Sequence, residues 1–220
     1  MPIVGYILTA LLGYLLGSIP TGYLVAAARG IDIRTVGSGN IGATNVFRYL
    51  GVPAGIFVLL ADAFKGWLAV AVVTPLLWSL FHATAGPMAR EWLAIIAGLS
   101  AILGHNFTCW LHFKGGKGIA TSAGVIAALV PLALVIILGI WIIVFGITRY
   151  VSLASICAAA SLPLAAWLTG QSSTMIVIMG AMGVLAIYKH KANIQRLLKG
   201  TENRIGAKRT AAPEAPKDRA

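Results

Sequence analysis

The sequence predicts an all-α, polytopic membrane protein with about seven transmembrane helices, its N-terminus outside and its C-terminus in the cytoplasm. Of the 220 residues, 59% are hydrophobic and only 10% are charged, whereas soluble domains are about 45–50% apolar and about 25% charged. Several apolar runs are long enough to cross the hydrocarbon core of a bilayer. Lys and Arg interrupt these runs and gather near the C-terminus. With so little polar surface, the chain is expected to fold in lipid.

The apolar runs locate the individual spans. A helix needs about 20 residues to cross about 30 Å of hydrocarbon. No Lys or Arg precedes Arg29, so the first run lacks the basic start of a signal peptide and is expected to stay as an uncleaved helix. Runs that should each cross once lie at about 3–28, 53–81, 92–112, 151–169 and 173–189.

The segment 118–148 is expected to cross twice. Lys and Arg concentrate in cytoplasmic loops of membrane proteins, and a single crossing here would put Lys117 and Arg149 on opposite sides. A hairpin that turns near Pro131 keeps every basic segment inside. Its first arm is shorter than a full span and must therefore be buried by protein.

The chain is predicted to form one membrane domain, residues 1–202, followed by a basic tail at 203–220. The net charge is +11, and nine of the 17 Lys and Arg residues lie between Lys189 and Arg219. This distribution favours cytoplasmic loops and anionic lipid over nucleic acid as the partner of the charge. The composition of the tail predicts disorder or contact with a lipid surface.

The first candidate segment for chemistry is G-S-G-N-I-G-A-T-N-V-F-R, residues 37–48. Its opening matches the dinucleotide pattern G-x-G-x-x-G, but that pattern requires a preceding strand, and a membrane helix is predicted here. Glycines let backbone N–H groups approach an anion, and the Arg guanidinium suits phosphate oxygens. A plain polar loop is the alternative. The candidate phosphate-binding residues are Gly37, Ser38, Gly39, Asn40, Thr44, Asn45 and Arg48.

The second candidate segment is F-K-G-G-K-G-I-A-T, residues 113–121. Glycines alternate with lysines just before a predicted helix, whose N-terminus would carry partial positive charge and free N–H groups. Gly118 stands where a Walker A motif has Ser or Thr. A positive-inside anchor would need the lysines but not three glycines, so phosphate binding is favoured. The candidate residues are Lys114, Gly115, Gly116, Lys117 and Gly118.

The third candidate segment, residues 190–202, follows the last predicted span and contains a predicted interfacial helix. His190 and Asn193 are three residues apart and would face the same way on a continuous helix. Both could be ordinary polar residues at a membrane boundary. Their place at the inner mouth of the bundle favours a functional role.

Ionisable residues also occur inside the predicted spans. Asp62 and Lys65 are three apart in the second run, and such charges are costly in lipid unless they are paired. A mutual pair that stabilises the fold is slightly preferred over a functional role. His105, beside Asn106, either packs as part of a polar pair or reaches the site.

The sequence also lacks certain groups that chemistry often uses. No pair of acids stands near the three segments, and no His or Cys cluster has metal-ligand spacing, so neither a metal nor a cofactor is expected. A reaction would depend on positioning and electrostatic stabilisation instead of a strong protein base.

Taken together, three motifs in this order, G-S-G-N-x-G-A-T-N-x-x-R, F-K-G-G-K-G-x-A-T and H-x-x-N-I-x-R-L-L-x-G-x-E, closely resemble those of the bacterial acyl-phosphate-dependent glycerol-3-phosphate acyltransferases. The resemblance covers residues 17–202. One departure is Thr108, where the family often has a proline.

The resemblance implies transfer of an acyl group from acyl phosphate to the 1-hydroxyl of glycerol-3-phosphate, giving lysophosphatidic acid and phosphate at the start of phospholipid synthesis. It implies a monomer in the bacterial inner membrane, with a cytoplasmic active site and no nucleic-acid partner. It gives Ser38 and Arg48 as an essential pair, the stretch from Lys114 as the glycerol-3-phosphate loop, and His190 and Asn193 as a polar pair. Glu202 is expected to be structural.

Two other functions fit parts of the pattern. A transporter of a phosphorylated solute would use similar cationic loops, but its anion sites should line a path across the bilayer instead of one face. A lipid-binding scaffold would not need three glycine-rich anion motifs.

Overall fold

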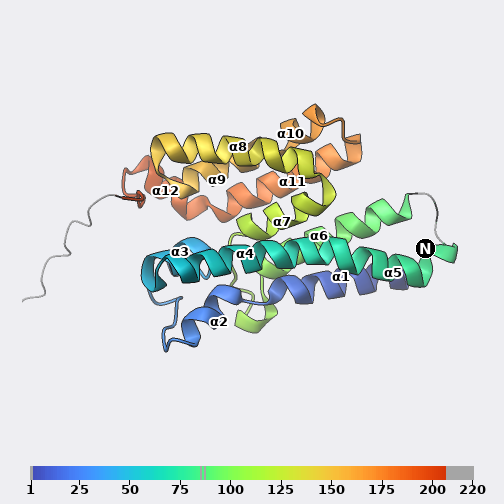
Figure 1. The fold of residues 1–220 in the computed structure, drawn as a ribbon, viewed down its shortest axis with the longest axis horizontal. Helices are drawn as coiled ribbons and strands as arrows, with labels where there is room; N and C mark the ends of the chain where they lie inside the picture. The colour runs from blue at the N-terminus through green and yellow to red at the C-terminus, as the bar shows by residue number, and fades with distance from the viewer. Residues whose placement is uncertain (1, 85, 87, 207–220) are drawn as a thin grey trace, which may run out of the picture.

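The computed structural model describes residues 2–84, 86 and 88–206, and this part of the chain forms a helical bundle without β-strands (Figure 1). The elements are α1 Ile3–Ser18, α2 Thr21–Ala27, α3 Ala43–Leu50, α4 Val52–Leu68, the π-helix η1 Ala69–Val73, α5 Thr74–Phe81, the 3-10 helix η2 His82–Thr84, α6 Ala89–Asn106, the 3-10 helix η3 Cys109–Leu111, α7 Ile119–Leu129, α8 Pro131–Thr148, α9 Val151–Ala160, α10 Leu162–Leu168, α11 Ser173–Lys189 and α12 Lys191–Leu198.

The predicted spans are present as helices. Within the described residues, four stretches are long and apolar enough to cross a membrane, and up to six are found if each bent helix pair counts as one span. The four are Ile3–Ala27, Val52–Phe81, Ala89–Leu111 and Pro131–Thr148. The pairs are α9 with α10, bent by 47°, and α11 with α12, bent by 59°. The all-α membrane bundle is thereby confirmed, while the count of seven spans and the orientation of the termini stay predictions.

The segment predicted to form a hairpin does turn beside Pro131. Helix α7 has only 11 residues, about 16 Å at 1.5 Å per residue, and Figure 1 shows α8 running back along it. Pro131 begins α8 at a position where its missing N–H costs no helical hydrogen bond. The short arm packs against α4, α6 and α8, so protein surrounds it as expected.

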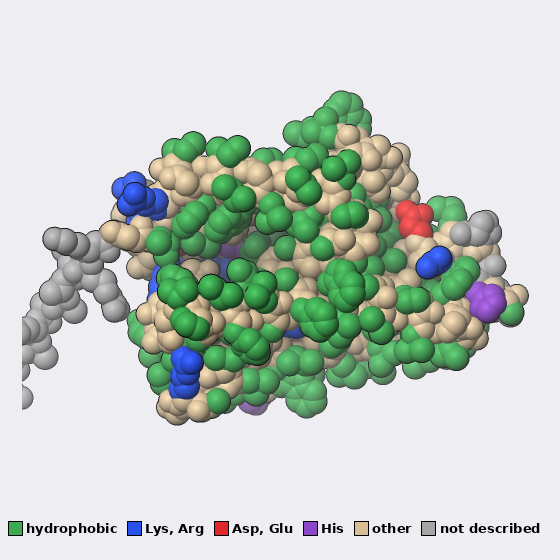
Figure 2. Space-filling model, in the orientation of Figure 1, with side chains coloured by type: hydrophobic (Ala, Val, Ile, Leu, Met, Phe, Trp, Pro, Cys, Tyr) green, Lys and Arg blue, Asp and Glu red, His purple; other side chains and the backbone are tan. Residues whose placement is uncertain are grey.

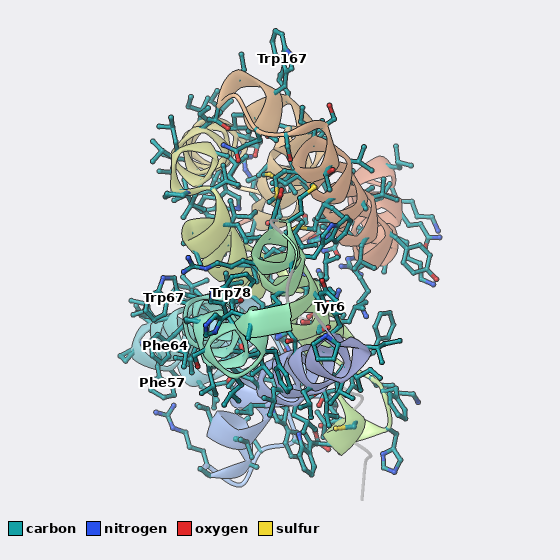
Figure 3. All side chains as sticks on the ribbon, turned by 90° about the vertical axis from the view of Figure 1, so that its right-hand side faces the viewer. Tyr6, Phe57, Phe64, Trp67, Trp78 and Trp167 are labelled. Carbon is teal, nitrogen blue, oxygen red and sulfur yellow. The ribbon has the colours of Figure 1, made fainter. Side chains whose placement is uncertain are left out.

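The bundle has two layers with α7 between them. Helices α1, α4 and α6 form one layer and α8 to α11 the other (Figure 1). The main apolar core lies where α6, α7 and α11 meet; among its members are Ile95, Ile102, Val125, Ile126, Met179 and Met182. Large apolar side chains also face outward, and Figure 3 shows Phe57, Phe64 and Trp167 pointing away from the bundle. This outer apolar surface suits lipid.

Polar side chains from other elements cap the C-terminal end of α1. The carbonyls in the last turn of a helix lack intrahelical donors, and Pro20 has no N–H to offer. Thr108 Oγ1 donates to Ser18 O at 2.6 Å, and Lys65 Nζ donates to Ile19 O at 2.7 Å. The cationic Lys65 also complements the negative end of the helix dipole. Thr108, the one departure from the family pattern, therefore joins α1 to the loop after α6.

Glycine allows the helices of the first layer to approach closely. A Cβ on Gly17 of α1 would overlap the carbonyl oxygen of Ala101 on α6, and one on Gly13 would lie 2.7 Å from Ala97 O. A Cβ on Gly124 of α7 would overlap Ala63 O on α4 in the same way. Such contacts substitute for the hydrophobic effect, which does not drive association between helices in lipid.

The first residues of the predicted tail, 203–220, contact the end of α8. Arg204 Nε donates to Thr148 O at 3.1 Å, and Ile205 N donates to Arg149 O at 3.0 Å. The chain therefore stays attached to the end of α8 as far as residue 205. The rest of the predicted tail, residues 207–220, lies outside the described residues.

Replacing Gly17 by alanine should destabilise the bundle, because the added methyl group must separate α1 from α6. Overpacking of this kind costs about 1–3 kcal/mol, and we expect a lower melting temperature in detergent. The matched control is Gly139→Ala on α8, where a Cβ meets no atom within 4 Å; it should melt no earlier than the parent. Equal melting of both variants would contradict the proposed contact.

Candidate active site

The first segment forms a tight loop that is shaped by a buried side chain. Gly37 and Gly39 have φ angles of 60° and 67°, in the left-handed region that favours glycine. Asn45 is 2% exposed, and its Oδ1 accepts from Ser38 N at 3.1 Å. Its Nδ2 donates to Val36 O at 3.0 Å. Both ends of the Asn45 amide therefore hold the loop, and direct substrate binding by Asn45 stays a prediction.

Helix α3 carries the arginine of the first segment toward the C-terminal segment. Arg48 is partly buried, and this burial lowers the pKa of its guanidinium, while the negative charge of Glu202 acts in the opposite direction. The positive charge of Arg196 lowers the same pKa further. Arg48 thus shares one electrostatic environment with residues about 150 positions later in the chain.

The glycine loop of the second segment lies on the end of α6. Gly116 N donates to His105 O at 3.0 Å, and Gly115 N donates to Asn106 O at 3.3 Å. A Cβ on Gly116 would overlap the His105 imidazole, so only glycine fits here. Gly118, with φ of 80°, then turns the chain into α7.

Lys117 emerges from this loop at the start of α7. Its Nζ donates to Asn193 Oδ1 at 2.6 Å. Burial lowers the pKa of Lys117 to about 8, although the negative charge of Glu202 partly opposes this effect. The free N–H groups in the first turn of α7 add positive potential beside the ammonium group.

The third segment bends at His190, between the last span and the predicted interfacial helix. Helix α11 ends at Lys189 and α12 begins at Lys191, with 59° between them. His190 lies at this bend and Asn193 on α12, and they are 3% and 5% exposed. His190 Nδ1 lies 2.8 Å from Ala186 O. Because a carbonyl only accepts, Nδ1 must carry the proton, which leaves Nε2 free for a ligand.

Glu202 holds the third segment together through three side-chain hydrogen bonds. Its carboxylate accepts from Asn193 Nδ2 at 2.8 Å, Arg196 Nε at 2.7 Å and Ser152 Oγ at 2.9 Å. Burial raises the pKa of Glu202, but these hydrogen bonds outweigh it, and the pKa lies below its usual value. Glu202 was expected to be structural, and these contacts agree. The sequence did not predict that Ser152 and Arg196 would bind Glu202. The one sequence feature that pointed to such a role was an acidic residue in a strongly basic segment.

These groups form one electropositive centre at one end of the bundle. The positive charges of Arg48 and Arg196 act on Lys117, that of Arg196 also acts on Arg48, and Glu202 is the acid among them. Figure 2 shows Lys and Arg side chains gathered at the end of the molecule that carries α3 and α12. In the described part of the chain, no group of His, Cys, Asp or Glu could hold a metal ion. The arrangement can bind anions and stabilise developing negative charge.

Two predicted site residues have no described side-chain contact with this centre. Ser38 and Lys114 are both exposed. The described contacts of Ser38 and Lys114 are backbone hydrogen bonds, from Ser38 N to Asn45 and from Lys114 N to Leu111 O. Binding by their side chains stays a prediction.

Comparison with known proteins identifies the family. The family model for glycerol-3-phosphate acyltransferase matches residues 7–200. The chain belongs to this family. Relatives named glycerol-3-phosphate acyltransferase include one from Synechococcus sp. (strain JA-3-3Ab), 44% identical over 94% of this chain and 97% of that protein, and one from Geobacter sulfurreducens, 46% identical over 91% and 97%.

Solved structures agree with the family assignment. The fold is similar to the integral membrane glycerol 3-phosphate acyltransferase PlsY (YgiH) in its glycerol 3-phosphate form. The TM-score is 0.80 and the identity 38%, over 91% of this chain and 96% of that one. Its lysophosphatidic acid form gives a TM-score of 0.78. The chain is therefore an integral membrane acyltransferase, as its motifs predicted.

Replacing Glu202 by glutamine should weaken the acyltransferase activity, because Asn193 and Arg196 lose the charge that holds them. Small displacements of positioning groups cost up to about 100-fold, and we expect kcat/KM to fall by about 10- to 100-fold. Asn203→Ala, at the neighbouring exposed position, is the control and should keep parental activity. Full activity of the Glu202→Gln variant would contradict a positioning role.

Proposed function

We propose that the protein transfers an acyl group from an acyl phosphate to the 1-hydroxyl of sn-glycerol-3-phosphate. The products would be lysophosphatidic acid and phosphate, for the synthesis of membrane phospholipid. The observation that supports this most is the gathering of Arg48, Lys117 and Arg196 beside the glycine loop. Both substrates carry a phosphate, and the donor also carries a fatty chain that suits the surrounding lipid.

The chemistry needs little from a protein base. The hydroxyl oxygen attacks the carbonyl carbon of the acyl phosphate, the bond from that carbon to the bridging oxygen breaks, and phosphate leaves with the electron pair. A phosphate oxygen of a substrate accepts the hydroxyl proton. The protein contributes positioning and electrostatic stabilisation, which are effective in a site shielded from water.

The side chains take different parts in this reaction. Arg48 and Lys117 bind the two phosphates, and the free Nε2 of His190 orients the hydroxyl group. Ser38 stabilises the oxyanion. Asn193 holds Lys117 in place through the 2.6 Å hydrogen bond.

The orientation and assembly belong to the same proposal. Basic residues concentrate at the end of the bundle that carries the centre (Figure 2), and basic ends of membrane proteins face the cytoplasm. This supports a site open to the cytoplasm of a bacterial inner membrane. All groups of the site come from one chain, so a monomer is sufficient.

Purified protein in detergent, supplied with glycerol-3-phosphate and palmitoyl phosphate, tests the reaction. We expect lysophosphatidic acid and phosphate in equal amounts, and no product with palmitoyl-CoA as donor. Turnover with palmitoyl-CoA alone would overturn the donor assignment. Uptake of glycerol-3-phosphate into liposomes without turnover would favour the transporter instead.

Direct transfer predicts that Ser38 is never acylated. No described hydrogen bond joins Ser38 Oγ to a base, and a serine needs such activation to become a nucleophile. In a single turnover with palmitoyl phosphate alone, intact-mass spectrometry should show unmodified protein. A stable acyl group on Ser38, absent from the Ser38→Ala variant, would show a covalent path.

The activity should decline at alkaline pH because Lys117 loses its charge. Its pKa is about 8, so the ammonium form binds phosphate below that pH and the neutral form predominates above it. The second pKa of a phosphate ester is near 6, as for phosphorylated side chains, so the ligand stays a dianion. We expect kcat/KM for glycerol-3-phosphate to fall by up to about tenfold per pH unit above 8.

Lys117→Arg is the control for this pH dependence. An arginine keeps its charge at any pH that the protein survives, so the variant should lack this decline even if its activity is lower. The same decline in the variant would show that another group causes it.

A further inference from the structure

Three ionisable side chains are buried together beneath the glycine loop. Asp62, Lys65 and His105 are 2%, 4% and 4% exposed. Asp62 Oδ1 lies 2.8 Å from Lys65 Nζ and 3.6 Å from His105 Nδ1. Ionisable groups at membrane depth are costly, and they often mark function. The sequence suggested the Asp62–Lys65 pair, and the structure adds His105 to it.

Charge balance alone does not account for this cluster. Asp62 and Lys65 already neutralise each other, and Lys65 also donates to Ile19 O at the end of α1. A third titratable side chain is not needed for that balance, and an apolar residue on α6 would be cheaper to bury. The presence of His105 therefore needs another explanation. Its contacts with the glycine loop, on the side of the residue away from Asp62, supply one.

The opposite side of His105 supports the glycine loop. Its carbonyl oxygen accepts from Gly116 N at 3.0 Å, and its ring Nε2 lies so close to Gly116 that a Cβ there would overlap it. The backbone carbonyl of His105 thus binds the Gly116 amide, and the His105 ring packs directly against the same glycine. The next residue after Gly116 is Lys117, whose ammonium group belongs to the electropositive centre.

We propose that Asp62 and His105 are positioning residues that hold the glycine loop in the shape that binds the phosphate of glycerol-3-phosphate. The Asp62 carboxylate orients the His105 ring by charge attraction across 3.6 Å, which is longer than a hydrogen bond. The ring in turn sets the position of Gly116 and the direction of Lys117. The proposal rests on the proposed function, because it takes glycerol-3-phosphate as the ligand of this loop. Neither residue touches the substrate.

Two variants separate positioning from stability. His105→Ala removes the imidazole ring that packs against Gly116. The double variant Asp62→Asn with Lys65→Met removes both charges of the pair, so no unpaired buried charge remains to unfold the protein, while the orienting carboxylate is lost. The control is Leu93→Ala on α6, the helix that also carries His105; Leu93 is fully buried, and its truncation destabilises the bundle away from the loop.

Binding is measured by calorimetry with glycerol-3-phosphate and no acyl donor, alongside KM for each substrate and the melting temperature. We expect both variants to raise the Kd and the KM for glycerol-3-phosphate at least tenfold, with the KM for palmitoyl phosphate changed less than twofold. Leu93→Ala should lower the melting temperature and leave the Kd within twofold of the parent.

Other results would overturn the inference. A Kd within twofold of the parent in either variant, or a rise in Leu93→Ala equal to theirs, would show that the cluster is only structural. The proposed function fails on a different readout, since a parent protein that binds glycerol-3-phosphate but makes no lysophosphatidic acid from palmitoyl phosphate lacks the proposed reaction. The loop inference would survive that result.

Discussion

The hydrogen bond from Lys117 to Asn193 is the contact on which the site depends, because it joins the glycine loop before α7 to α12 across 76 residues of sequence. A buried ammonium group needs an acceptor. Here the acceptor is a neutral amide, and the carboxylate of Glu202 lies behind it on Asn193 Nδ2. A direct pair between Lys117 and Glu202 would neutralise the cation that an anionic substrate requires. The intervening amide supplies stabilisation and leaves the positive charge available.

Close helix packing makes this contact possible. Without a hydrophobic drive between helices in lipid, small residues must bring the backbones together. Gly17 does so for α1 and α6, and Gly124 for α4 and α7. These close approaches keep the end of α6 beside the start of α7. The glycine loop connects the two helix ends. The loop needs glycine for the same steric reason, since His105 occupies the space beneath Gly116.

The sequence was sufficient for features that depend on local composition. The lengths of the apolar runs predicted the spans, and the positions of Lys and Arg predicted the turn beside Pro131. Both predictions follow from the cost of placing polar groups in lipid. Features that depend on contacts between distant residues were out of reach. The bend at His190 is not encoded by a proline or glycine there. Glu202 could not be connected to Ser152 before the fold brought α9 beside the segment that follows α12.

Residue type alone also could not show which polar side chains of the first motif hold the loop itself. Asn45 has the donors and acceptors of a ligand, yet both ends of its amide bind the loop backbone. The reason is physical: a loop with two glycines in the left-handed region has little conformational preference of its own, so a buried amide must supply it. A site that works by electrostatics needs its dipoles fixed before the substrate arrives. Much of the polar sequence in such a site therefore serves to hold the few groups that we propose bind the phosphates.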